Sequence, residues 1–185
     1  MSIDLSLYQT VPGTTFSAQA EILVQATPER AYAVATDLGR SGEWSTECRG
    51  GTWVSGAPGQ VGSIFRGDNS RGTEPVAWAP VIRGPWNTES EVVEAEPGRA
   101  FRWVVLTSGR ARQESRWSYE FEPAPDGGCL VTHSYWLGRL TEGLEKIMSG
   151  LDDAHRARFV REWNAKLNED IRATVDRLRI AIEKD

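Results

Sequence analysis

Cysteine, histidine and long apolar runs are all scarce in this sequence. Cys48 and Cys129 are the only cysteines among 185 residues. Two isolated cysteines form neither a disulfide framework nor a metal site, so both thiols are expected to be buried and reduced. The two histidines are distant from each other and match no zinc-binding pattern. We therefore predict no metal ion and no cofactor.

No stretch of the chain approaches the run of about eighteen apolar residues that a membrane span requires, so no transmembrane segment is predicted. The first residues, MSIDLSLYQTVPGTT, have neither a basic start nor a long apolar run. A signal peptide is not expected from such a start. These features together predict a cytoplasmic protein.

Motifs that mark several enzyme classes are missing as well. The sequence contains no Walker-type phosphate loop, no dinucleotide glycine fingerprint after its first predicted strand and no GxSxG nucleophile elbow. The net charge is −5, and arginines alternate with acidic residues instead of forming a basic stripe. A nucleic-acid partner is therefore not expected.

Tryptophan, in contrast, is abundant. Eight tryptophans are many for this length, and tryptophan is common in cores and ligand cavities. With 25% charged and 39% hydrophobic residues, the chain has the composition of an ordinary globular protein. We predict an N-terminal extension over residues 1–15 and a single domain over residues 16–185.

The C-terminal stretch from Asp152 to Glu183 has the clearest pattern. Its large apolar residues recur at steps of three and four, which places them on one face of a helix about 45 Å long. They are Val160, Trp163, Leu167, Ile171, Val175, Leu178 and Ile182. The opposite face carries Arg158, Glu162, Lys166, Glu169, Asp176 and Glu183. A broad curved sheet could cover such a stripe, and a coiled coil is the alternative.

The preceding sequence alternates in the manner of strands. A first strand over residues 16–26 is followed by a helix that Thr27 caps and Pro28 begins, ending near Gly39. Trp44 is expected to be a buried anchor in the next turn. Six further strands are predicted over residues 49–54, 60–69, 86–94, 100–107, 112–122 and 129–137. Because the turns between these strands are short, neighbouring strands are expected to pair antiparallel. Residues 72–85 are predicted to form a long functional loop, and residues 141–148 a short helix. This order predicts an α+β fold.

The stretch ILVQATPERAYAVATDLGRSGEWS resembles the strand–helix opening of the SRPBCC, or START-like, helix-grip superfamily. The stretches VGSIFRGDN, ESEVVEAEPGRAFRWVV and WSYEFEPAPDGGCLVTHSY are similar to later strands of its polyketide cyclase/dehydrase group, and DIRATVDRLRIAIE to its C-terminal helix. The resemblance covers residues 18–183. It implies a curved antiparallel sheet of about seven strands around the C-terminal helix, with a deep cavity between them.

Strand alternation shows which side chains could line such a cavity. The predicted wall is apolar and aromatic with a few hydroxyl groups, which suits a flat hydrophobic ligand. Its ligand-binding candidates are Phe65, Ser90, Phe101, Trp103, Trp117, Phe121 and, midway along the C-terminal helix, Trp163, Leu167 and Ile171. The alternative is a filled core in which these side chains only pack together.

The candidate catalytic residues are Tyr119, His133, Tyr135 and Asn69. An imidazole titrates near neutrality, and a phenol can protonate an enolate. His133 and Tyr135 qualify only if residues 131, 133 and 135 face inward, and the opposite facing of that strand is left open. Asn69 either donates a hydrogen bond into the cavity or belongs to a strand-end turn. Arg49 is expected to share a face with Gly51 and Trp53.

The predicted function is binding of a hydrophobic, aromatic or polyketide-like small molecule, with cofactor-free cyclisation or dehydration as the reaction if the protein is an enzyme. Two alternatives are a lipid or metabolite carrier or sensor, and a cochaperone-type protein-interaction domain. A homodimer is compatible with each of these functions.

Overall fold

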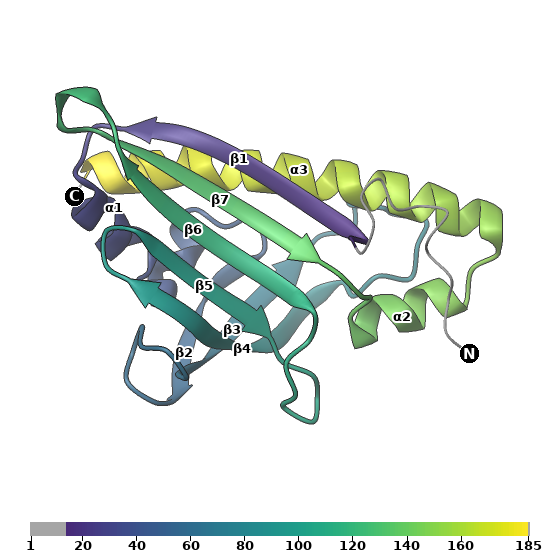
Figure 1. Cartoon of the computed structure of the whole chain (residues 1–185). Coiled ribbons are helices and arrows are strands. Elements are labelled where there is room, and N and C mark those ends of the chain that lie inside the picture. The colour runs from purple at the N-terminus through teal and green to yellow at the C-terminus, as the bar shows by residue number, and fades with distance from the viewer. Residues whose placement is uncertain (1–13, 185) are drawn as a thin grey trace.

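A seven-stranded antiparallel sheet curves around one long helix in the computed structural model, which describes residues 14–184 (Figure 1). In chain order the elements are β1 (Phe16–Val24), α1 (Pro28–Ala35), the 3-10 helix η2 (Leu38–Glu43), β2 (Cys48–Ser55), β3 (Ile64–Arg71), β4 (Gly84–Glu96), β5 (Ala100–Val105), β6 (Ser115–Pro123), the 3-10 turn η3 (Pro125–Gly127), β7 (Cys129–Leu137), α2 (Glu142–Ser149) and α3 (Asp153–Lys184). The strand order is β1-β7-β6-β5-β4-β3-β2. The predicted α+β helix-grip fold is confirmed. Over residues 14–184, every helix is too short or too polar to cross a lipid bilayer.

Both short helices begin at the predicted caps. The Thr27 side chain accepts a hydrogen bond from the Arg30 amide at 3.3 Å, and Pro28 occupies the first turn of α1. The Thr141 side chain accepts from the Leu144 amide at 3.4 Å and starts α2. A threonine in this position satisfies an amide that has no partner within the helix.

The apolar stripe of α3 is buried along its whole length, as predicted, against the sheet instead of a second coil. The prediction for Lys166 is wrong. This residue was expected on the solvent face of the helix, but it is only 9% exposed. Its ammonium group is bound by Glu47 from the loop before β2 and by Asp170 on the next turn of α3. Helical spacing could not reveal that a distant loop covers this position.

Strand β2 contains an irregularity that corrects the expected position of Arg49. The pairing with β3 shifts between Cys48 and Gly51, and Gly50 and Gly51 both have positive φ. Cys48 therefore lies opposite Asn69, and Arg49 is exposed instead of sharing the inner face. Glycines permit this backbone because they have no Cβ to clash.

Two strands are shorter at their N-terminal ends than predicted. Residues 56–63 form turns before β3, and residues 106–114 form a long hairpin connection before β6, closed by hydrogen bonds such as Thr107 N to Ala111 O at 2.8 Å. The predicted extension over residues 1–15 falls outside the described residues except for Thr14 and Thr15. Thr15 donates its hydroxyl to the Gly138 carbonyl at 2.9 Å, which ties this point to the end of β7.

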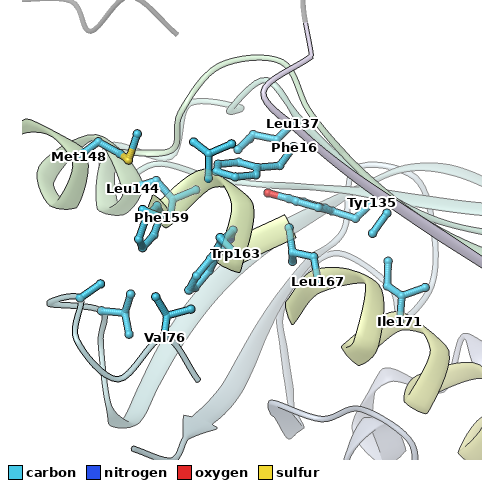
Figure 2. Close-up of a cluster of buried hydrophobic side chains, with 14 residues drawn as sticks. Phe16, Val76, Tyr135, Leu137, Leu144, Met148, Phe159, Trp163, Leu167 and Ile171 are labelled. Carbon is cyan, nitrogen blue, oxygen red and sulfur yellow. The ribbon is translucent and has the colours of Figure 1, made fainter. Parts of the chain in front are cut away.

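The buried apolar side chains form three clusters. The largest lies between the N-terminal half of α3, α2, β1 and β7 (Figure 2). A second packs α1 and the C-terminal half of α3 on β6 and β7. A third, smaller cluster contains Leu38, Phe65, Val92 and Phe101. The inward apolar residues of β3–β7 belong to these clusters or, like Trp103 and Trp117, are partly buried against them.

Candidate functional site

The concave face of the sheet brings the candidate aromatic residues into two adjoining rows. In one row Trp117 pairs with Trp103 on one side and Tyr135 on the other. In the next row Tyr119 pairs with Phe101 and His133. Alternate residues of β7 from Cys129 to Leu137 are buried, so the structure selects the facing in which residues 131, 133 and 135 point inward.

Rings in these rows stack on one another. The centroids of Tyr119 and His133 are 4.3 Å apart, as are those of Trp117 and Tyr135. Trp117 also lies nearly parallel to Trp103, at 6.3 Å between centroids. Such contacts hold the rings in fixed positions, so the face presents a rigid aromatic surface.

His133 is neutral and has one tautomer in this setting. Its Nδ1 lies 2.9 Å from the Ser118 carbonyl oxygen, which can only accept, so Nδ1 carries the proton. Burial lowers the pKa of His133 to about 4, more than this hydrogen bond raises it. Its Nε2 is therefore a hydrogen-bond acceptor at neutral pH.

The two inward phenols differ in their surroundings. Burial raises the pKa of Tyr119, and the Trp44 indole, which donates toward its hydroxyl, opposes that shift. Trp44 is only 2% exposed, as expected of a buried anchor. Burial also raises the pKa of Tyr135, whose hydroxyl points among the residues of the large cluster (Figure 2). Both side chains remain protonated at neutral pH.

Several polar atoms of this face have no hydrogen-bond partner among residues 14–184. They are the Tyr135 hydroxyl, the His133 Nε2 and the Ser90 hydroxyl, although each residue is at most 8% exposed. In the described part of the chain, no side-chain nitrogen or oxygen is both fully enclosed and unpaired. Each of these three atoms therefore has some surface that a water-sized group can reach, and an unpaired polar atom in such a position can bind water or a polar group of a ligand.

The two central tryptophans of this face are also incompletely covered. Trp103 and Trp117 lie on the inner face of β5 and β6, where a filled core would enclose them, and yet both are only half-buried. Asn69 also faces inward, within β3 and not in a turn. Its amide nitrogen donates to the Gly67 carbonyl at 3.2 Å and to the Thr88 hydroxyl at 3.1 Å. Only its amide oxygen remains for a ligand, so the predicted donor role is taken up within the protein.

Other ligand-binding candidates are packed within the core clusters. Phe65 and Phe101 belong to the small cluster, and Phe121 to the cluster around α1. Trp163, Leu167 and Ile171 are buried in the large cluster, where residues from the 72–83 segment and β7 cover them (Figure 2). Of the predicted wall, Trp103, Trp117 and Ser90 are thus the residues with surface that a ligand can reach.

Comparison with known proteins identifies the family of this chain. The model of the family described as polyketide cyclase / dehydrase and lipid transport matches residues 15–183. The chain belongs to this family. No curated protein matches the chain significantly.

Solved structures of the family fold superpose over most of their length. A Polyketide_cyc-like protein from Corynebacterium glutamicum is 25% identical with a TM-score of 0.58, covering 92% of this chain and 93% of that one. A conserved protein from Geobacillus kaustophilus is 14% identical with a TM-score of 0.60 over 91% and 96% of the two chains. The Aha1 dimer from Colwellia psychrerythraea is 16% identical with a TM-score of 0.50 over 90% and 96%. The last two likenesses concern the fold alone.

In this member of the family, a charged cluster joins α3 to the far edge of the sheet. Glu47 accepts from the Arg71 guanidinium at 2.9 Å and from the Lys166 ammonium at 2.7 Å. Burial raises the pKa of the Glu47 carboxyl, but the hydrogen bond from Arg71 and the charges of Lys166 and Arg71 outweigh it and hold the pKa below its ordinary value. The guanidinium of Arg71 also lies over the rings of Trp86 and Trp163, at 4.5 and 5.1 Å.

The predicted long loop is a flap, defined here as residues 72–83, that lies on α3. The Trp78 indole donates to the Glu162 carboxylate at 2.6 Å, and the Arg158 guanidinium lies 4.6 Å from the centre of the Trp78 ring. Arg83 donates to four flap carbonyls, at Gly72, Pro75, Val76 and Ala79. Three apolar flap residues are buried, namely Val76, Ala79 and Val81. The flap therefore has an ordered structure fixed by one arginine.

Substitution of Arg83 by methionine is expected to loosen the flap while leaving the sheet intact. Its hydrogen bonds to the flap carbonyls are lost, and charged hydrogen bonds contribute about 1.5–3 kcal/mol each. The amides of Ala79 and Val81, which bond to carbonyls within the flap, should then exchange with solvent roughly tenfold faster or more. Hydrogen exchange measures this, and Arg99→Met at an exposed ion pair is the control. Unchanged flap exchange in Arg83→Met would contradict the assigned role.

Sequence reasoning missed three contributors to this region. Cys48 reaches the inner face only through the irregularity of β2, where a Cβ on Gly67 would lie 3.6 Å from its sulfur. Glu47 and Lys166 are far apart in sequence, and an isolated charge gives no sign of its partner. The spacing of Lys166 and Asp170 is the one available signal, since residues four apart on a helix can pair.

Proposed function

We propose that the concave face of β3–β7 binds a hydrophobic, aromatic or polyketide-like molecule that stacks on Trp103 and Trp117. The accessible unpaired polar atoms on an otherwise aromatic face carry this proposal. A ligand would cover the two half-buried indoles and supply partners for those atoms. Membership in the polyketide cyclase / dehydrase and lipid transport family supports it.

The polar groups define the ligand further. His133 offers an acceptor, and the hydroxyls of Tyr135 and Ser90 offer donors. All three are uncharged at neutral pH, because burial lowers the pKa of His133 and raises that of Tyr135. A neutral ligand that carries both a hydroxyl group and a carbonyl group on a flat apolar skeleton suits this set. Bringing an ion next to them would cost desolvation without a compensating charge.

Cyclisation or dehydration is the second candidate function, favoured by the pairing of a phenol and an imidazole on neighbouring strands. Holding a flexible chain in one folded conformer itself accelerates the reaction, because the entropy cost of bringing the reacting atoms together is met when the ligand binds. Tyr119 or Tyr135 would donate to a developing enolate oxygen, and His133 would accept a proton. A pKa of about 4 makes His133 a weak base, so positioning would contribute more than proton abstraction.

A cochaperone-type interaction domain is not favoured by the surface. The described chain has few exposed large apolar residues, and most of them come from segments far apart in the sequence, whereas a binding patch needs several of them together. They are Leu23, Val54, Val61, Ile82 and Ile180. The Colwellia relative is a dimer, and analytical ultracentrifugation would show whether this chain also self-associates.

Binding of a neutral fluorescent probe, N-phenyl-1-naphthylamine, tests the proposed face. Trp117→Ala should weaken binding roughly tenfold, because stacking on one half-buried aromatic ring contributes about 1–1.5 kcal/mol. Trp136→Ala is the matched control, since Trp136 is also half-buried but lies on the outer face of β7 under Arg116. Equal losses in the two variants would contradict the proposal.

The proposed hydrogen bond between Tyr135 and a ligand is tested with two ligands that differ by one hydroxyl group. Wild-type protein should bind 1-naphthol more tightly than naphthalene, and Tyr135→Phe should reduce this preference by about threefold to tenfold, the effect of one neutral hydrogen bond. An unchanged preference would remove Tyr135 from the site. Native mass spectrometry of protein purified from its source would then identify a retained ligand, and incubation with that ligand would separate a carrier from an enzyme.

A further inference from the structure

A hollow lies beside the C-terminal end of α1, and its lining contains none of the residues of the two aromatic rows. It has a volume of about 480 Å³ and is bounded by the C-terminal end of α1, the loop from β2 to β3 and the turn from β4 to β5. Its walls include Tyr32, Thr36, Asp37, Trp53, Pro58 and Pro97. This volume is within the range of small-molecule pockets.

The backbone and charge of this hollow both favour a positive ligand. α1 ends at Ala35 next to it, and the last turn of α1 contains no basic residue. The partial negative charge of the helix C-terminus is therefore not neutralised from within the helix. Asp37 comes two residues after Ala35, and among residues 14–184 its carboxylate has neither an ion pair nor a side-chain hydrogen bond. Both features place unneutralised negative charge beside the hollow.

Two aromatic side chains of the hollow are held in place by contacts with phenylalanine rings of the core. Tyr32 contacts Phe121 at 5.5 Å and Phe101 at 6.2 Å between ring centroids, both edge-to-face. Trp53 contacts Phe65 edge-to-face at 5.3 Å. Tyr32 and Trp53 are half-buried and pack on the small cluster of Leu38, Phe65, Val92 and Phe101. Their faces are thus pre-organised, and the face of an aromatic ring attracts cations.

We propose that this hollow is a binding site for an organic ammonium cation with an apolar or aromatic body. The ammonium group would lie between Asp37 and the faces of Tyr32 and Trp53, and the body would contact Pro58 and Pro97. An anion would meet the helix C-terminus and Asp37 unfavourably. This site does not depend on the ligand proposed for the concave face.

Three probes of similar size and different charge test the site: benzylammonium, benzyl alcohol and phenylacetate. Their dissociation constants are measured by NMR from shifts of the Trp53 indole resonance. Benzylammonium is expected to bind roughly tenfold more tightly than benzyl alcohol, which is a moderate value for a cation–π contact. Phenylacetate is expected to bind most weakly. Equal affinity for benzylammonium and benzyl alcohol, or no saturable shift with benzylammonium, would overturn the proposal.

Variants locate the cation within the hollow. Asp37→Asn should weaken benzylammonium binding roughly threefold, as expected for an exposed carboxylate, and leave benzyl alcohol binding unchanged. Asp176→Asn, at an exposed position of α3, is the matched control and should change neither. Trp53→Leu, followed by ligand-observed NMR, should weaken binding of both probes. If Asp176→Asn has the same effect as Asp37→Asn, the attraction is only that of the net charge and the site is rejected.

Discussion

Replacing Glu47 with glutamine is expected to lower the free energy of unfolding by about 3 kcal/mol, the largest effect that any single polar substitution here should have. Glu47 is the anion shared by Arg71 and Lys166, whose side chains are 8% and 10% exposed. An amide cannot balance either charge. Lys166 keeps Asp170, but Arg71 keeps only the Ile82 carbonyl and its two indole rings. A buried cation without its counter-ion is costly.

The prediction is tested by measuring the free energy of unfolding in urea for Glu47→Gln and for the control Glu96→Gln. Glu96 pairs with Arg99 at the surface, where both side chains are largely exposed, so its loss should change stability by no more than about 1 kcal/mol. Equal effects of the two substitutions would show that the cluster is screened by solvent. Replacing both residues, Glu47→Met with Arg71→Met, should recover part of the loss, because the cation that has no second carboxylate is removed together with its anion, while Lys166 keeps Asp170.

The stability of the protein is expected to fall by about 3 kcal/mol as the pH is lowered from about 6.5 to 4, on account of His133 alone. The pKa of His133 is about 4 in the folded protein, against 6.5 for an ordinary histidine. Within this window the unfolded chain takes up a proton that the folded protein does not. Stability therefore rises with pH through the window and is independent of His133 above it.

Unfolding free energies between about pH 5 and 6 isolate this contribution, with an expected slope of about 1.1 kcal/mol per pH unit. The carboxyl groups whose pKa is lowered, such as Glu47, titrate below their ordinary value of 4.5 and so contribute little there. His133→Gln should flatten the slope, whereas His155→Gln, at an exposed site, should retain it. NMR titration of the His133 imidazole measures the same pKa directly, and a value near 6.5 would contradict the prediction.

The sequence predicted the fold because its strongest patterns are local. The stripe on α3, the caps at Thr27 and Thr141 and the alternation in β6 and β7 are each decided by neighbouring residues. Alternation also indicated that Trp117, Tyr119 and Phe121 share one face of β6, but it left the facing of β7 open. The structure decides it, because the register places Tyr119 opposite His133 and the odd-numbered residues of β7 are buried.

The parts that could not be predicted depend on contacts between distant segments. Lys166 has the spacing of a surface residue, and only the loop that carries Glu47 buries it. Arg49 would face inward in a regular strand, but two glycines turn the chain of β2. Whether Trp103 borders open space or a filled core depends on how closely α3 approaches, and α3 lies nearest to β1. Periodicity contains no information on such distances.

The way the flap is held has a consequence for the speed of ligand exchange. Trp78 and Arg83 hold the flap through hydrogen bonds, and these would have to break and form again if a ligand passed beneath it. Such contacts raise the barrier to arrival and to departure equally, and so cancel in the dissociation constant. Affinity would then be a property of the indoles on the concave face, and residence time a property of the flap. Association and dissociation rates in Arg83→Met should both increase while their ratio stays the same.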